Sequence, residues 1–134
     1  MLSTYTGTLT QNSTRTLTVG TAGFIQQGGT FLGGDSAITL NGPFSLSAGT
    51  FTATSGTMST NGSVNFTVTG SPTFSHNSGT ITFTSAGTAT NTVTPGTLTY
   101  NNVSFLGYNF TTSLVGTMTV NGNLTLGDTY STGR

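Results

Sequence analysis

The stretch MTVNGNLTL at residues 118–126 contains two apolar–polar–apolar triplets separated by an Asn-Gly-x corner. The same nine-position pattern occurs as ITLNGPFSL at 38–46 and as MSTNGSVNF at 58–66, where Thr60 takes one apolar slot. A copy that is one residue shorter, LTYNNVSF, occupies 98–105. The copies start at 38, 58, 98 and 118, so every interval is a multiple of 20 residues. A fixed period of this size is typical of stacked repeat proteins.

One repeat, from residue 38 to residue 57, divides into three strands and three corners. We expect strands at 38–40, 44–46 and 51–53, with corners at 41–43, 47–49 and 54–57. Alternating apolar and polar residues are the pattern of a half-buried strand. The sequence therefore predicts an all-β fold, a parallel β-helix or β-solenoid. Its three-sided coils would contain about 20 residues and lie about 4.8 Å apart.

The chain reads as a single β-solenoid domain over residues 1–134. We expect an irregular N-terminal coil at 1–35, regular repeats at 36–127 and a tail without a strand at 128–134. The corner at 77–80 is long, so the coil expected to begin near residue 78 is distorted. No helix is expected, because Gly, Thr and Asn are poor helix formers and no apolar stretch has a 3.6-residue period.

Stacked repeats would align their side chains in columns. The predicted inward columns are Ile38, Met58, Leu98 and Met118; Phe44, Val64, Val103 and Leu124; and Leu46, Phe66, Phe105 and Leu126. We expect Met58, Val64, Met118 and Leu124 to be buried. A corner ladder of stacked amides is expected at Asn41, Asn61, Asn101 and Asn121.

An antiparallel, pilin-like β-sandwich is the alternative fold. Asn-Gly is a strong hairpin signal, and turns at this spacing also suit sandwiches. A two-residue hairpin at Asn121-Gly122 would send Leu124 to the opposite face from Val120, whereas a three-residue loop would keep one face. The fixed period favours the solenoid, but the sandwich remains open at this point.

The composition excludes several classes of function. Charged residues make up 3% of the chain, and these are Arg15, Arg134, Asp35 and Asp128. The formal net charge is zero, so we expect no nucleic-acid partner and no attraction to an anionic membrane. Apolar runs are too short for a membrane span, so no membrane insertion is expected. There is no cysteine, hence no disulfide framework and no thiol chemistry.

The repeats resemble bacterial cell-surface β-strand-repeat proteins of the parallel β-helix type, found in autotransporter passengers and in haemagglutinin-like adhesins and filaments. The residues that carry the resemblance lie at 49–66, 79–83, 100–105 and 116–127. The resemblance covers roughly residues 36–127. It implies an exported structural or adhesive stalk without a fixed ligand.

No residue pattern indicates catalysis. His76 is the one histidine, and no nucleophile elbow accompanies it, so we interpret it as a corner residue. Asp35 and Asp128 lie far apart in sequence, which argues against paired carboxylates. The Gly33-Gly34-Asp35 stretch is similar to a calcium-binding glycine–aspartate repeat but occurs once. We therefore expect no enzyme, no cofactor and no metal.

Two surface features remain. Among the sequons, Asn61 and Asn123 at corners are the better candidate glycosylation sites. Thr-x-Thr runs recur at 50–54 and 80–84. Ranks of Thr on a flat solenoid can order water, but the irregular middle of the chain is expected to disrupt them.

These observations predict a structural protein of the cell surface. We expect an extracellular β-solenoid subunit that joins copies of itself end to end into a fibre or adhesive stalk, with surface glycans as a further candidate partner. The alternative is an ice- or carbohydrate-binding β-solenoid module. The first 20 or so residues are expected to pair with the C-terminal coil of the next copy.

Overall fold

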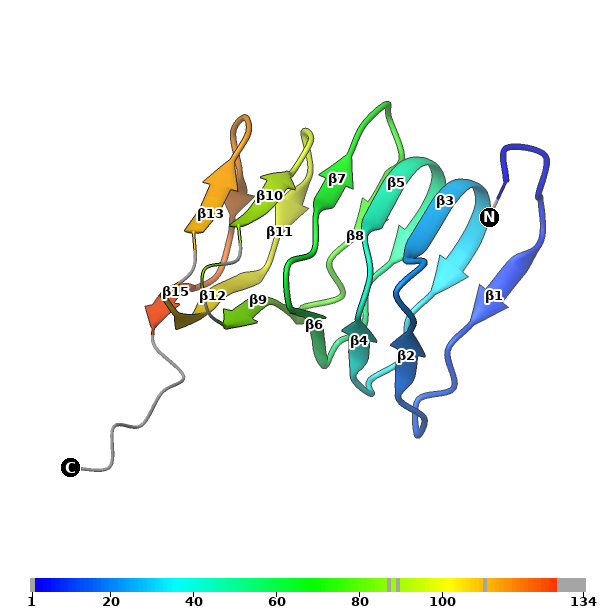
Figure 1. Ribbon diagram of the computed structural model, residues 1–134. Coiled ribbons are helices and arrows are strands. Elements are labelled where there is room, and N and C mark those ends of the chain that lie inside the picture. Colours follow the sequence, from blue (N-terminus) through cyan, green and yellow to red (C-terminus); the bar gives the residue numbers. More distant parts are fainter. Residues whose placement is uncertain (1, 87, 89, 110, 128–134) are drawn as a thin grey trace.

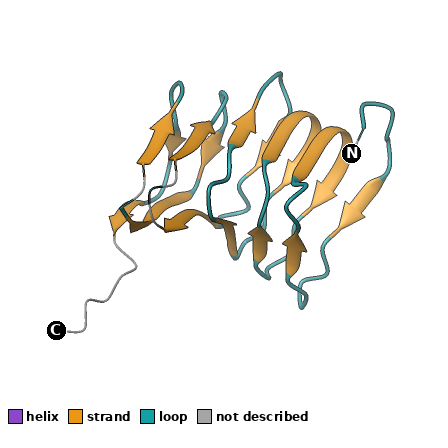
Figure 2. Ribbon diagram, in the orientation of Figure 1, coloured by secondary structure: helices purple, strands orange, loops and turns teal. Residues whose placement is uncertain are grey.

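The computed structural model describes residues 2–86, 88, 90–109 and 111–127, and the tail expected at 128–134 lies outside them. The described residues form strands and loops without a helix (Figure 2). The strands are β1 (Thr8–Thr10), β2 (Leu17–Val19), β3 (Phe24–Leu32), β4 (Ile38–Leu40), β5 (Phe44–Thr52), β6 (Thr57–Asn61), β7 (Phe66–Val68), β8 (Thr73–Ser75), β9 (Thr80–Ala86), β10 (Thr90–Thr94), β11 (Thr99–Tyr100), β12 (Asn102–Tyr108), β13 (Thr111–Leu114), β14 (Thr119–Val120) and β15 (Leu124–Gly127). Across these same ranges, no helix is long and apolar enough to cross a membrane.

The strands stack along one axis as a parallel β-solenoid. Every strand pair in the described part of the chain is parallel, and each pair joins strands of consecutive coils. Figure 1 shows the stack running from β1 at one end to β13 and β15 at the other. The predicted parallel β-helix is confirmed. The antiparallel sandwich is excluded, because its hairpins would require antiparallel pairs.

Each regular coil has three sides. The first side is a six-stranded sheet in the order β15-β12-β9-β6-β4-β2. The second and third sides share one sheet, because β3 and β5 bend from one side to the other. The first three residues of β5 pair with β7, whereas its last three pair with β8. The second side therefore contains residues 24–26 and 44–46 with β7, β10 and β13, and the third contains β1, residues 30–32 and 50–52, and β8.

The bend within β5 depends on Gly49. Its φ of 85° is in the left-handed region that glycine tolerates and most residues avoid. A Cβ at this position would lie 2.5 Å from the backbone oxygen of Gly29 in the neighbouring coil. The corner can therefore turn this tightly only with glycine.

A small separate sheet, in which β11 pairs with β14, carries the third side toward the C-terminal coils. Chain order supports this placement, because β14 follows β13 of the second side and precedes β15 of the first. The ring of Tyr100 on β11 also lies 5.4 Å from the ring of Phe74 on β8. Three-sided coils therefore continue through the described residues.

One inward column runs through all six strands of the first side. Its members, in register, are Leu17, Ile38, Met58, Ile81, Val103 and Leu124. The intervals are 21, 20, 23, 22 and 21 residues, so the coil averages about 21 residues and its length varies. Corners absorb the additional residues without breaking the column.

The predicted column of Ile38, Met58, Leu98 and Met118 is wrong beyond its first two members. The stretch at 38–46 joins the first side to the second, whereas the similar stretch at 98–105 joins β11 to β12 and so joins the third side to the first. The repeated pattern encodes a corner flanked by two strands, and the fold uses it at two different corners. Ile81 takes the place predicted for Leu98.

The other two predicted columns mix sides in the same way. Phe44 aligns with Phe66 rather than with Val64, and Leu46 aligns with Val68 rather than with Phe66. Val103 and Leu124 are neighbours as predicted, but they belong to the first side. Phe105 and Leu126 are also neighbours on the first side, where they follow Phe83 in register.

Burial agrees with the prediction in the middle of the stack and not at its C-terminal end. Met58 and Val64 are 1% and 3% exposed, which confirms the expectation for both. Met118 is half-buried. Leu124 is 57% exposed, so the prediction that it is buried is wrong. The physical reason is that β15 pairs with β12 alone among the described strands, so no described strand covers its outer edge.

Two aromatic ladders fill the interior of the N-terminal half. On the second side, the Phe24, Phe44 and Phe66 rings stack with centroids 5.4 and 4.5 Å apart. On the third side, the rings of Phe31, Phe51 and Phe74 stack at 5.0 and 6.0 Å. The ladders meet edge to face, as between Phe44 and Phe51 at 80°. Each such pair contributes about 0.5–1.5 kcal/mol beyond its buried area, so the ladders stabilise one register.

Candidate functional site

The C-terminal end of the stack presents unpaired strand edges. Within the described residues β13 pairs with β10 alone, β14 with β11 alone and β15 with β12 alone. Leu126 on β15 is 74% exposed, and Leu114 on β13 is also exposed. A hollow of about 380 Å³ opens at this end, and it is lined by Phe105, Thr112, Leu114, Leu126 and Gly127. The end is therefore an apolar surface bordered by free backbone N–H and C=O groups.

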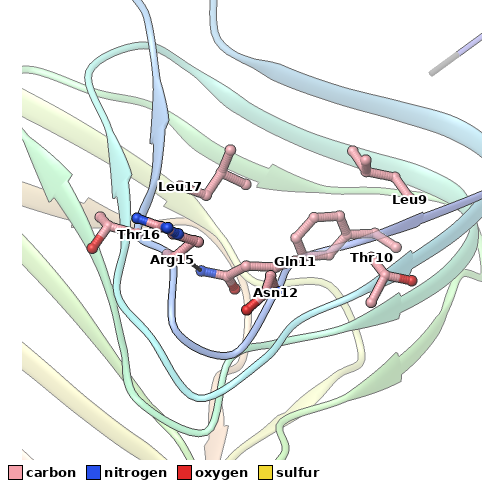
Figure 3. A pocket seen from close by; sticks show the side chains of 8 residues that line it. Leu9, Thr10, Gln11, Asn12, Arg15, Thr16 and Leu17 are labelled. Atoms are coloured by element: carbon pink, nitrogen blue, oxygen red, sulfur yellow. Dashed lines mark hydrogen bonds between the residues drawn. The ribbon is translucent and has the colours of Figure 1, made fainter.

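The N-terminal end has the same character. In the described part of the chain, β2 pairs with β4 alone and β1 pairs with β3 alone. A hollow of about 190 Å³ lies between them (Figure 3). It is lined by Leu9, Thr10, Gln11, Asn12, Arg15, Thr16, Leu17 and Phe31. Arg15 is the one charged side chain in this lining.

Gln11 fixes the corner between β1 and β2. Its side chain is buried, and Nε2 donates to the backbone oxygens of Arg15, Ser36 and Ala37 at 2.9, 3.2 and 3.1 Å. Its Oε1 accepts the N–H of Gly34 at 3.2 Å. These bonds attach the first corner to the following coil, so the N-terminal edge is held in a fixed shape.

The two ends are complementary on the first side. Leu124, Thr125 and Leu126 at one end alternate apolar, polar and apolar, as do Leu17, Thr18 and Val19 at the other. Adding β2 of a second copy to β15 would continue the inward column from Leu124 to Leu17. Chemically, this arrangement can accept a further parallel strand at each end.

The four asparagines of the predicted corner ladder lie in two separate pairs. Asn61 Nδ2 donates to Asn41 Oδ1 at 3.0 Å, at the corner between the first and second sides. Asn101 and Asn121 lie at the corner between the third and first sides, where the N–H of Gly122 donates to the backbone oxygen of Asn101 at 2.9 Å. The Asn101 amide instead donates to the backbone oxygen of Ser78 at 2.7 Å. The structure therefore does not bring all four amides into one ladder.

The two candidate glycosylation sites are both exposed. The Asn61 nitrogen that a glycan would occupy donates the hydrogen bond to Asn41. The N–H of Asn123 donates to Asn102 Oδ1 at 2.9 Å, a bond that does not use the Asn123 side chain. Of the two, Asn123 offers its amide without breaking the corner bond described above.

His76 lies at the corner after β8, where its side chain contacts the backbone two residues further on. Its Nδ1 accepts the N–H of Ser78 at 3.0 Å, and both Asn77 and Ser78 have positive φ. Asp35 is exposed, with its carboxylate 3.5 Å from the Ser36 hydroxyl, and Asp128 lies outside the described residues. The described His, Asp and Glu side chains form no group of three that could hold a metal ion. His76 thus has a local structural contact at a tight corner.

Hydroxyl groups form ranks on the outer surface of the third side, although the irregular middle of the chain was expected to disrupt such ranks. Thr8, Thr30, Thr50 and Thr73 align in one column, and Thr10, Leu32, Thr52 and Ser75 align in a second. We call these eight residues the threonine face. The recurring Thr-x-Thr and related triplets could have indicated this face in the sequence. They recur at intervals of 22, 20 and 23 residues, so a search for a fixed 20-residue period does not align them.

The irregular middle of the chain also leaves the first side intact. Its outward column contains Thr18, Thr39, Ser59, Thr82, Ser104 and Thr125. Each of these carries a hydroxyl, including Thr82 in the coil that was expected to be distorted. The expected disruption is therefore wrong, because the additional residues lie in the loops at 62–65 and 69–72, and the strands that follow these loops stay in register with the preceding coil.

Comparison of the chain with protein-family models, with curated proteins and with solved structures finds no match.

Proposed function

We propose that this chain is a structural segment of an extracellular fibre or adhesive stalk in which copies stack end to end. The observation that supports the proposal is the complementary alternation of β15 and β2 at the two open ends of the first side. A head-to-tail contact of this kind is heterologous, so it propagates as an open filament unless rotation closes a ring. The proposal assigns the chain no reaction.

Burial at the joint supplies the driving force. Leu124 and Leu126 are exposed at one end, and Leu9 is exposed at the other. Each fully buried side chain of this kind contributes about 1.5–3 kcal/mol. The new coil contact would also pair backbone groups that now face solvent. With a formal net charge of zero, no long-range repulsion keeps copies apart.

The register at the joint follows from chain order. On the first side, Thr125 of one copy would lie beside Thr18 of the next, which extends the outward hydroxyl column. On the third side, β14 precedes β15 just as β1 precedes β2. Continuing the coil therefore brings β1 of the second copy against β14 of the first. This contact agrees with the expectation that the first 20 or so residues pair with the C-terminal coil of a neighbour.

A paired-cysteine variant tests this register, because the chain contains no cysteine of its own. We expect Thr18→Cys/Thr125→Cys to give a ladder of disulfide-linked multimers after mild oxidation, seen on a non-reducing gel. Neighbouring strands lie about 4.8 Å apart. That spacing lies within the Cα separation of about 4.4–6.8 Å that a disulfide spans.

Two matched variants serve as controls. Thr39→Cys/Ser59→Cys joins neighbouring strands within one copy and should give an intramolecular disulfide, which checks that this surface permits the bond. Thr18→Cys/Ser104→Cys moves one cysteine a full coil away from the end and should give no ladder. A full-length protein that sediments as a stable monomer at high concentration, with no ladder from the test pair, would refute the proposal.

A further inference from the structure

We propose that the threonine face binds the surface of ice crystals. The face lies on a lateral side of the solenoid and leaves the strand edges of the two ends unused, so this activity is independent of the end-to-end assembly proposed above. Four coils contribute one strand each, and seven of the eight outward residues carry a hydroxyl. All eight are exposed or half-buried.

The array is regular in two directions. Along the stack, parallel pairing places Thr30, Thr50 and Thr73 in register at about 4.8 Å per coil. Along each strand, outward residues such as Thr50 and Thr52 are two positions apart, which is about 6.6 Å. A regular two-dimensional array of donors and acceptors is the kind of surface that can match another lattice, and ice is a lattice of water molecules.

The interior holds this array rigid. Directly beneath the threonine face, the rings of Phe31, Phe51 and Phe74 stack with interplanar angles of 18° and 1°. Phe31 and Phe51 are each 1% exposed. A one-residue slip of any strand would expose its phenylalanine and bury its threonines. The hydroxyl spacing is thus fixed before water binds, so binding requires little further loss of side-chain conformational entropy.

The side-chain chemistry favours ice over other ligands. Each threonine presents a hydroxyl, which both donates and accepts, together with a methyl group. None of the eight residues is charged, so no strongly hydrated ion interrupts the ordered water. None is aromatic, so the face offers a sugar ring no surface for stacking. Carbohydrate binding is therefore the weaker interpretation of this surface.

Substitutions on two sides of the same solenoid test the proposal. The purified full chain is expected to show thermal hysteresis and to inhibit ice recrystallisation. Thr50→Arg places a bulky charge in the centre of the face and should abolish both activities. Thr67→Arg is the matched control: Thr67 lies between the buried Phe66 and Val68, points outward on the second side and has Ser45 and Thr94 as neighbours.

Two further variants keep the test decisive if an arginine disturbs folding. Thr50→Val keeps the shape and removes one hydroxyl, so it should lower the hysteresis while circular dichroism stays unchanged. Leu32→Thr supplies the hydroxyl that the second column lacks, and it should raise the hysteresis. A wild-type chain that neither shapes ice crystals nor shows hysteresis would overturn the proposal. Equal losses in Thr50→Arg and Thr67→Arg would overturn the assignment to this face.

Discussion

Tyr100 combines burial with an ionisable proton. The side chain is 1% exposed, and its phenol donates to the backbone oxygen of Pro95 at 2.7 Å. Desolvation by burial raises the pKa of Tyr100 above the value of about 10 that tyrosine has in water. The folded chain therefore holds this proton more tightly than the unfolded chain. The resulting stability is fully present below about pH 10 and is lost progressively as the pH rises above that value.

The first prediction at this scale concerns alkaline unfolding. The free energy of unfolding of the wild-type chain should fall above about pH 10, measured by denaturant titration at a series of pH values. Tyr100→Phe should remove much of that dependence. At neutral pH it should cost about 1–3 kcal/mol, because the Pro95 oxygen loses its partner inside the core. Tyr108→Phe, at an exposed position, is the control. An unchanged alkaline slope in Tyr100→Phe would contradict the assignment.

At the scale of the strand, we predict that aspartate destabilises the fold by different amounts at two neighbouring positions of the inward column on the first side. Val103 is 0% exposed on β12, whereas Leu124, its neighbour in register on β15, is exposed. Val103→Asp would place a carboxylate in an apolar column without a partner and should cost about 3 kcal/mol or more. Leu124→Asp should cost the single copy about 1 kcal/mol or less, because its carboxylate stays in water.

The same pair separates folding from assembly. Leu124→Asp should remain folded by circular dichroism and melt near the wild-type temperature. It should nevertheless fail to form filaments, because the carboxylate would be buried at the joint. Melting and sedimentation of the two variants together measure both effects. If Leu124→Asp unfolded the C-terminal coils as readily as Val103→Asp, the open-edge description of β15 would be wrong.

The sequence predicted the element types and missed the alignment of the elements. Alternating triplets and Asn-Gly corners were sufficient to place strands such as β4, β6 and β15, because these signals are local. They did not show which corner each copy of the pattern forms. The corner at 41–43 leads from the first side to the second, whereas the similar corner at 101–102 leads from the third side to the first. Pairing across coils decides that assignment, and a single sequence does not contain it.

The threonine face was missed for a related reason. Its triplets were visible, but a fixed period of 20 residues placed the triplet at 73–75 out of step with that at 50–52. The solenoid tolerates coils of different length, because extra residues enter corners, where they disturb no ladder hydrogen bonds. The loops at 62–65 and 69–72 are such places, because across them the interval between paired residues grows from 20 to 23 while the strands stay in register. The strands of successive coils therefore stay in register even though the number of residues per coil varies.

At the scale of the whole molecule, the fold is a one-dimensional stack. Each coil contacts only its neighbours, so stability is approximately a sum of coil and interface terms. The central strands β5, β6 and β9 have partners on both sides, whereas β1, β2, β14 and β15 have described partners on one side. Opening should therefore begin at the ends and proceed inward.

Hydrogen exchange measures how easily each strand opens, so it can compare the ends of the stack with its centre and show how assembly changes that difference. In dilute solution, amide protons of β15 and β2 should exchange quickly, and those of β5 and β6 slowly. At concentrations that give filaments, protection of β15 and β2 should rise, because each edge gains a strand, while β5 and β6 should change little. Leu124→Asp, which should stay monomeric, should show no such rise at the same concentration. Uniform protection along the stack in dilute solution would contradict the one-dimensional description. A rise confined to the central strands would contradict the end-to-end joint.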